Sequence, residues 1–308
     1  MTAPLVVVSV SGGKDSTATL VLALDQVPRD RLRAVFADTG NEHELTYQYV
    51  RDYLPTRLGV PIHEVRADFT DWMARRREYV TEHWPAKGVP PDVIQRVLGA
   101  LHPTGNPYLD LCLIKGRFPS RKAQFCTEFL KTEPLSEYQG TLIAKHGAIE
   151  AWQGVRADES ASRAQLPARD DRGGGLVLVR PILRWSVADV FAHLATHAVE
   201  PNPLYRQGMS RVGCMPCIHA KKDELLAISH RYPGHLDRIE AWEAQVALAS
   251  KRQESSFFPD PEEDAHLHRR GIRNMVQWAA TTRGGVQYGL FRQGADEPGC
   301  ASAYGLCE

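Results

Sequence analysis

LVVVSVSGGKDST at residues 5–17 is the stretch that decides the fold of this chain. Its first part, Leu5–Val10, is apolar and rich in β-branched residues, which is typical of a buried parallel strand. The apolar and small residues from Thr17 to Leu24 indicate a helix directly behind it. Between them, Gly12 and Gly13 permit backbone angles that are closed to other residues. The stretch therefore predicts a strand, a tight turn and a helix.

The turn has the groups that bind phosphate. A helix that begins here offers free N–H groups and the positive end of its dipole, and serine and threonine hydroxyls and Lys14 add further donors. Asp15 is acidic where phosphates are expected, so the pattern predicts that a cation such as Mg²⁺ is bound with them. The stretch is not a Walker loop, which needs four residues between its glycines and a Lys-Ser/Thr pair.

Composition sets broad limits. The 308 residues are 43% hydrophobic and 24% charged, as in an ordinary globular protein of one large or two modest domains. The formal net charge is zero, so there is no overall basic signature for nucleic acid. No segment reaches about 18 apolar residues, and no charged-then-apolar leader precedes the first strand. We therefore expect no membrane span and a cytoplasmic location, where six cysteines favour metal, cluster or redox chemistry.

Strand and helix patterns alternate downstream. Further strands are expected at 32–37, 61–65, 149–152 and 176–179, with a helix at 44–54. Such alternation predicts a doubly wound, mostly parallel α/β sheet with right-handed crossovers. Ligands of these sheets lie outside the carboxyl ends of the strands, so Ser11–Thr17 and Asp38–Gly40 are expected to share one nucleotide.

The second half of the chain is less regular. Residues 157–175 are polar and rich in Arg, Asp and Gly, and we interpret them as a mobile loop over the site. Ser186 is expected to cap a helix that runs to His197. After Pro201 the pattern turns helical and gains cysteines. We predict a nucleotide-binding α/β domain at 1–200 and a helical region at 201–308 with a flexible, cysteine-bearing tail.

Several blocks carry a resemblance to a known family. Ser11–Ser16 match the S-G-G-K-D-S signature of the PP-loop ATP pyrophosphatase superfamily, which cleaves ATP between its α and β phosphates. Within it, the chain resembles the phosphoadenosine phosphosulfate (PAPS) reductase family. The blocks that resemble that family, over about two-thirds of the chain, are Val35–Gly40, Cys126 with Lys131–Leu135, Gly154–Arg163, Arg180–Ile182 with Trp185, and Asn202–Gly208 leading into Gly213–Cys217.

The resemblance implies an adenine nucleotide alpha hydrolase-like fold and roles for individual residues. The phosphate-holding residues would be Ser11, Gly12, Gly13, Lys14, Asp15, Ser16 and Thr17, and Asp38, Thr39 and Gly154 would complete the nucleotide site. Arg156 and Arg163 would reach over phosphate or sulfate, because a guanidinium matches such oxyanions bidentately. The implied catalytic set is Lys14, Asp15, Arg156, Arg163 and Cys307.

Three departures from reductases matter. Reductases that bind a sulfonucleotide usually carry an eroded loop, whereas this loop is intact, as in members that hydrolyse ATP. Their nucleophilic cysteine stands in a tail reading E-C-G-L-H, whereas Tyr304–Glu308 read Y-G-L-C-E. Cluster-bearing reductases have adjacent cysteines ahead of K-x-E-P-L, whereas Cys126 stands alone. A near-terminal Cys307 could still carry sulfur, or be an accidental thiol of a frayed end.

The cysteines leave several metal readings open. Cys214-x-x-Cys217 has ligand spacing for zinc or an iron–sulfur cluster, and Cys126 is the third ligand by resemblance. The fourth position falls to Cys300, Cys307 or His219, or stays open. Three interpretations remain: a [4Fe-4S] cluster, which the DNA phosphorothioation branch of the family uses, free redox-active thiols, or zinc. Cys112 is expected to be a plain buried residue.

The leading hypothesis is a PAPS-reductase-like ATP pyrophosphatase that binds ATP with Mg²⁺ and releases AMP and pyrophosphate. Water or an acceptor such as nucleic acid would attack, ahead of sulfur transfer. The alternatives are a true sulfonucleotide reductase that releases sulfite, and a non-catalytic nucleotide-binding module that assists other proteins. A homo-oligomer is expected.

Overall fold

The computed structural model describes residues 4–258 and 271–281. The predicted strand, turn and helix are present as β1 (Leu5–Ser9) and α1 (Lys14–Gln26). The other strands are β2 (Leu32–Asp38), β3 (Ile62–Arg66), β4 (Ile149–Trp152), β5 (Arg169–Gly173) and β6 (Leu176–Val179). They form a six-stranded sheet in the order β3-β2-β1-β4-β6-β5, parallel except for β5 at the edge. The predicted α/β class and the mostly parallel sheet are confirmed.

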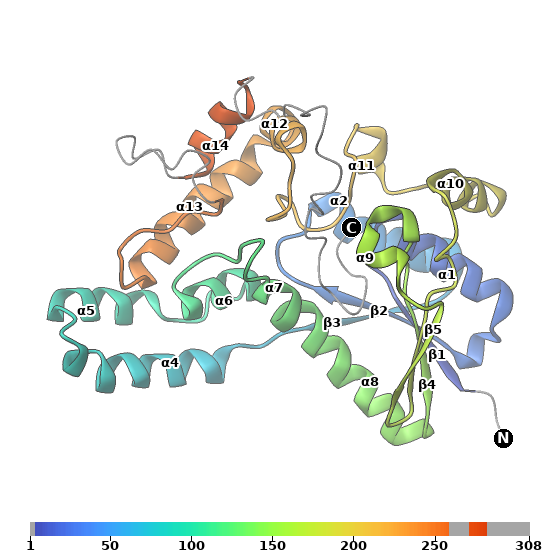
Figure 1. Cartoon of the computed structure of the whole chain (residues 1–308), viewed down its shortest axis with the longest axis horizontal. Helices are drawn as coiled ribbons and strands as arrows, with labels where there is room; N and C mark the ends of the chain where they lie inside the picture. The colour runs from blue at the N-terminus through green and yellow to red at the C-terminus, as the bar shows by residue number, and fades with distance from the viewer. Residues whose placement is uncertain (1–3, 259–270, 282–308) are drawn as a thin grey trace.

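The sheet is covered on both faces because β1 alternates its side chains. Val6 and Val8 face the core shared with α1 and α10 (Val187–Thr196), whereas Leu5 and Val7 face α8 (Glu133–His146). Figure 1 shows the sheet between these helices. Such two-sided burial explains why β1 is an unbroken apolar run rather than an alternating one.

The sheet order changes direction at β1. The chain steps from β1 to β2 and β3 on one side, whereas β4, β6 and β5 lie on the other. At such a switch point the loops after neighbouring strands part and leave a crevice at the carboxyl ends. Here those loops are Ser11–Gly13 after β1 and Gln153–Arg156 after β4.

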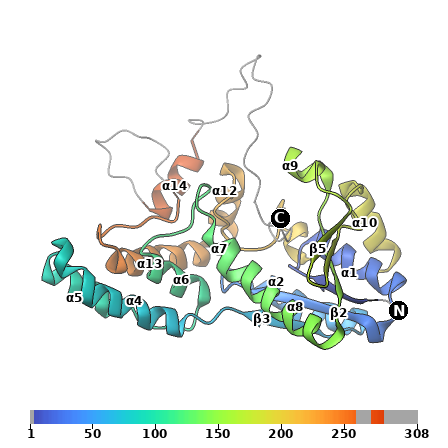
Figure 2. The same cartoon turned by 60° about the horizontal axis from the view of Figure 1, so that its bottom comes forward.

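A separate group of helices extends away from the sheet, and both views show it (Figures 1 and 2). Its members are α4 (Thr70–His83), α5 (Pro91–Ala100), α6 (Pro107–Lys115), α12 (Lys222–Arg231), α13 (Pro233–Ala249) and α14 (Ile272–Ala279). One apolar core joins residues from 69–130 with residues from 204–279, and buried Cys112 is part of it. The helical core thus draws on both sides of residue 200, and the domain boundary there stays a prediction.

Short helices connect these parts. They are η1 (Arg29–Arg31), α2 (Glu44–Gln48), η2 (Tyr49–Tyr53), α3 (Leu54–Leu58), η3 (Pro85–Lys87), α7 (Phe125–Thr127), η4 (Glu128–Thr132), η5 (Ala157–Glu159), α9 (Ala161–Ala164) and α11 (Pro203–Arg206). Two of them, η2 and η4, are π-helical turns. Among the described residues, no helix combines the length and apolar character that a membrane crossing requires.

One sequence-based interpretation is wrong. Residues 157–175 are not a loop: they form η5, α9 and the edge strand β5, which pairs antiparallel with β6. The side chains of β5 are largely exposed, so the sequence of this strand lacks the apolar pattern by which a strand is predicted. The three glycines at 173–175, all with positive φ, form the turn of this hairpin.

Candidate functional site

The loop after β1 is held in shape by its own polar groups. The Ser16 and Thr17 hydroxyls donate to the Gly13 carbonyl at 3.1 and 2.8 Å, and the Ser11 N–H donates to Ser16 Oγ at 3.1 Å. Gly12 has a φ of +82°, and a Cβ there would lie 2.8 Å from Thr46 Cγ2. The loop is therefore preorganised, and glycine is required at position 12.

Two residues from a distant segment brace this loop. Tyr205 OH accepts a hydrogen bond from the Lys14 N–H at 3.0 Å, and Asn202 Nδ2 donates to the Gly12 carbonyl at 3.2 Å. Both belong to the N-P-L-Y block, for which sequence reasoning assigned no role. Their position in this block is the sequence feature that could have identified them.

Asp15 is the electrostatic centre of the loop. Its side chain is fully buried, and its carboxylate lies 2.9 Å from Lys14 Nζ and 2.6 Å from Arg156 Nε. Burial alone would lower the pKa of Arg156, but the carboxylates of Asp15, Asp158 and Glu159 together outweigh it and raise that pKa. Two side chains thus balance the charge of Asp15 in this structure, and the Mg²⁺ expected at this residue stays a prediction.

The loop after β4 packs directly on the loop after β1. A Cβ at Gly154 would lie 2.7 Å from both the Asp15 carbonyl carbon and the Ser16 nitrogen, so only glycine permits this approach. Arg156, two residues on, is then placed to reach Asp15. The structure thus brings three predicted residues, Asp15, Gly154 and Arg156, into one contact.

Arg163 is linked to this contact indirectly. Its guanidinium pairs with the Glu159 carboxylate, which accepts a hydrogen bond from the Arg156 N–H at 3.0 Å. Arg156 also pairs with Asp158. The predicted role of both arginines over phosphate or sulfate stays a prediction.

Asp38 and Thr39 follow β2 at the same edge of the sheet. Asp38 is buried and accepts hydrogen bonds from Tyr47 OH at 2.7 Å and from the Gly40 N–H at 2.8 Å. The Thr39 hydroxyl donates to Glu42 Oε1 at 2.6 Å. Asp38 therefore orders the turn that it begins, and its predicted place beside the nucleotide is untested. Sequence reasoning missed Tyr47 and Glu42, which no motif marked.

Cys126, Cys214 and Cys217 line one pocket although they come from distant segments. The cavity, about 40 Å³, is also lined by Glu42 and by Ser11. Ser11 belongs to the loop of residues 11–17, which we call the phosphate-type loop. Cys214 Sγ lies 3.5 Å from Thr39 Oγ1 and 3.8 Å from Glu42 Oε1. The cysteine pocket, as we call it below, thus adjoins the loop of residues 11–17.

Burial governs the charges in the cysteine pocket. It raises the pKa of Cys126 to about 11, and it also raises that of Cys214. Burial alone would lower the pKa of Lys131, but Cys214, Glu42 and the other two cysteines outweigh it and raise that pKa. Cys126 and Cys214 therefore favour the neutral thiol, and Lys131 beside them favours the charged ammonium.

The three cysteines can be tested against a metal or cluster. Among the described residues their sulfurs do not form a group within 4.8 Å of one another. Thiolates bound at about 2.3 Å to one tetrahedral zinc would lie about 3.8 Å apart, so this spacing disfavours zinc. A [4Fe-4S] cluster separates its thiolates further, and Lys131 would offset its negative charge. A cluster at these cysteines stays a prediction. Cys300 and Cys307 lie outside the described residues.

A braced glycine loop at the switch point of a parallel sheet is typical of α/β proteins that bind nucleotides. The model of the phosphoadenosine phosphosulfate reductase domain matches residues 5–88 and 113–220. The chain belongs to this family, which is part of the PP-loop ATP pyrophosphatase superfamily.

Individual proteins are similar to this chain over different shares of their length. An uncharacterized 37.8 kDa protein of Escherichia phage 186 is 45% identical over 326 positions, covering 98% of this chain and 96% of that protein. The adenosine 5'-phosphosulfate reductase of Allochromatium vinosum is 40% identical over 103 residues, 33% of this chain and 37% of that enzyme. The crystal structure of a PAPS reductase from Candida auris in complex with phosphate has 18% identity and a TM-score of 0.44, covering 70% of this chain and 84% of that one.

Proposed function

We propose that this chain is an ATP pyrophosphatase that binds ATP at residues 11–17 and releases AMP and pyrophosphate. The observation that carries the proposal is the complete, braced loop with Lys14 at the start of α1. A loop that only joined a strand to a helix would have no need of a lysine ammonium beside a fully buried carboxylate.

The residues divide the work. The Ser11 hydroxyl and N–H groups at the start of α1 would hold the β and γ phosphates as the leaving group, and the Ser16 and Thr17 hydroxyls, which donate to the Gly13 carbonyl, would keep the loop in the shape that binds them. Lys14 would offset the charge that develops at the α phosphate. Arg156 pairs with Asp15, and Asp15 in turn pairs with the Lys14 ammonium and holds it in place. Mg²⁺, when bound with ATP, would neutralise phosphate charge, and Asp15, the carboxylate of this loop, would hold it.

The acceptor of the AMP group is proposed to be water or a nucleophile such as a nucleic-acid group. The test is product identity. Purified protein is incubated with Mg²⁺-ATP, and AMP, ADP, pyrophosphate and phosphate are resolved. Lys14→Ala and Lys145→Ala, the latter on the exposed end of α8, are purified in parallel. AMP and pyrophosphate from wild type and Lys145→Ala alone support the proposal; ADP as the product, or equal yields from all three, contradicts it.

A second candidate is sulfonucleotide reduction, and the cysteine pocket beside Ser11 favours it. A thiolate would attack the sulfate sulfur, the S–O bond to the nucleotide phosphate would break, and an external thiol would then release sulfite as a disulfide forms. Cys307 is the proposed nucleophile. Sulfite formed from adenosine 5'-phosphosulfate or PAPS with dithiothreitol, and lost in Cys307→Ser, supports this reading. If neither nucleotide is turned over, the non-catalytic module is the remaining class.

A further inference from the structure

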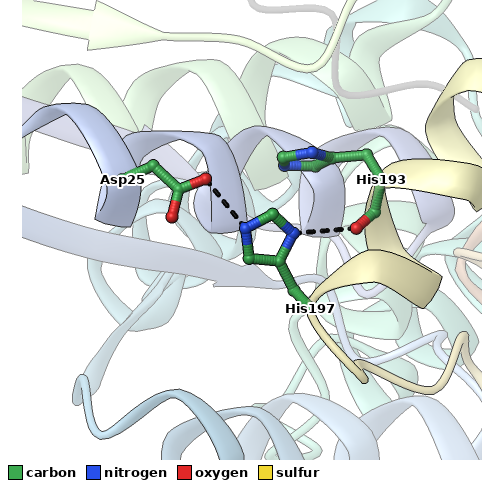
Figure 3. A group of neighbouring side chains, drawn as sticks. All are labelled: Asp25, His193 and His197. Carbon is green, nitrogen blue, oxygen red and sulfur yellow. Dashed lines mark hydrogen bonds and ion pairs between the residues drawn. The ribbon is translucent and has the colours of Figure 1, made fainter.

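A histidine pair and a carboxylate meet on the far end of α1 from the loop. Asp25 lies near the end of α1, and His193 and His197 lie four residues apart at the end of α10, so they share one helix face. Figure 3 shows the three side chains together. One ligand atom from each lies within 4.8 Å of the others.

The hydrogen bonds of His197 leave one nitrogen facing an acceptor. Its Nδ1 lies 2.9 Å from the His193 carbonyl oxygen. A carbonyl can only accept, so Nδ1 carries the proton. In the neutral ring Nε2 then has a lone pair, yet it lies 2.9 Å from Asp25 Oδ2. Two acceptors at this distance need a cation between them, either a second ring proton or a metal ion.

The side chain of His193 favours a metal ion over a second ring proton on His197. His193 Nε2 is buried and has no hydrogen-bond partner among the described residues. A buried polar atom without a partner is costly, and a proton on His197 would leave it unsatisfied. A metal ion would instead take lone pairs from both rings and from the carboxylate. The 2.9 Å spacing also suits two ligands of one zinc-like ion, which lie about 2.9–3.4 Å apart at ordinary bond lengths and angles.

We propose that Asp25, His193 and His197 bind a divalent transition-metal ion of the zinc type. Two imidazoles and one carboxylate form a donor set for such ions and not for Mg²⁺ or Ca²⁺, which prefer oxygen. Three protein ligands leave a fourth position open toward solvent, where Asp25 and His197 side chains are 46% and 30% exposed. The ion would tie the end of α1 to α10.

A second histidine cluster provides the control. His43, Glu44 and His235 also lie close together, but His43 Nδ1 accepts from the Leu45 N–H at 3.0 Å, and Arg238 lies 2.8 Å from His235 Nδ1. That cluster has its own donors and a resident cation, so it is not expected to bind metal.

The experiment counts metal ions. Full-length wild type, His193→Ala, His197→Ala, Asp25→Asn and His235→Gln are stripped with EDTA, dialysed against Zn²⁺ and analysed by mass spectrometry. Cysteine-bound zinc is common to all five, so the differences report the histidine sites. We expect one equivalent fewer in the first three variants and none lost in His235→Gln. Equal stoichiometry in wild type and His197→Ala would overturn the proposal and leave a protonated His197–Asp25 pair.

Folding of the variants is checked without metal by circular dichroism and thermal unfolding. Arg57 donates to the His197 and Ala198 carbonyls, which holds the end of α10 independently of the ring. Asp25→Asn changes only an exposed group, so it keeps the test decisive if a histidine variant unfolds. Zn²⁺ should raise the unfolding temperature of wild type more than that of folded Asp25→Asn; an equal rise counts against the site.

Discussion

The phosphate-type loop and the cysteine pocket share Ser11 but are built in opposite ways. The loop satisfies its charges internally: Asp15 is paired twice, and the hydroxyls bond to the backbone a few residues away. The pocket gathers thiols from distant segments around one lysine, and burial raises the pKa of Cys126 and Cys214. The charges of the first region are paired before a ligand arrives, whereas in the second Cys126 and Cys214 favour the neutral thiol until something binds. Nucleotide cleavage and sulfur chemistry are therefore expected to be separable.

The largest expected effect tests that separation directly. Lys14→Ala should lower AMP release from ATP by about 100- to 1000-fold, because one charged contact to the transition state is typically worth about 3–4 kcal/mol. Cys217→Ser should leave the same rate within about threefold. Initial rates at saturating ATP measure both. If the two variants lose activity equally, the two regions act as one site.

The second prediction concerns the thiols of metal-free protein. With its pKa raised from 9.0 to about 11, Cys126 should hold roughly 100-fold less thiolate at pH 8 than an unfolded cysteine. The corresponding stability is present below pH 9 and lost as the pH rises from 9 toward 11, because the unfolded thiol ionises first. Iodoacetamide labelling of Cys126, followed by mass spectrometry with and without guanidinium, checks this. Equal rates would show that burial does not control the thiol.

Much of the loop region could be predicted from sequence because the residues that form the loop are contiguous. Leu5–Val10, the glycines and Lys14 stand together, and the strand at 149–152 has the bounds that the structure gives. The pocket could not be assembled this way: Glu42 and Lys131 meet the cysteines only through the fold. Residues 157–175 failed for another reason, since an exposed edge strand has neither an apolar face nor an alternating pattern.

The third prediction compares two glycines. Gly154→Ala places a Cβ against the backbone of Asp15 and Ser16 and should destabilise the protein by about 1–3 kcal/mol while weakening ATP binding. Gly140→Ala, in α8 with open space around it, should stabilise by about 0.5–1 kcal/mol. Urea unfolding midpoints and ATP titrations measure the pair. A harmless Gly154→Ala would mean that the two loops do not touch.

The smallest effect concerns the brace from Tyr205. Tyr205→Phe removes the acceptor of the Lys14 N–H but keeps the ring beside Phe191. A single hydrogen bond contributes about 0.5–1.5 kcal/mol, so KM for ATP should rise about two- to tenfold. Tyr53→Phe removes a similar bond, to the Glu200 N–H, away from the loop and should leave KM unchanged. If KM rises in both variants or in neither, Tyr205 has no specific part in nucleotide binding.

The π-helical turn η4 changes the directions in which the side chains on either side of it point. Cys126 and Lys131 are five residues apart, which in a regular α-helix would point them about 140° away from each other. The Glu133 N–H bonds to the Glu128 carbonyl, and i→i+5 bonding widens the turn so that residues five apart point to nearly the same side. Deleting one residue between them would restore the α-helical pitch and leave the two residues four apart, about 40° from each other, so they would still share one face. The surplus residue of the π-turn thus lets a thiol and an ammonium five residues apart face the same side, as residues four apart do in an α-helix.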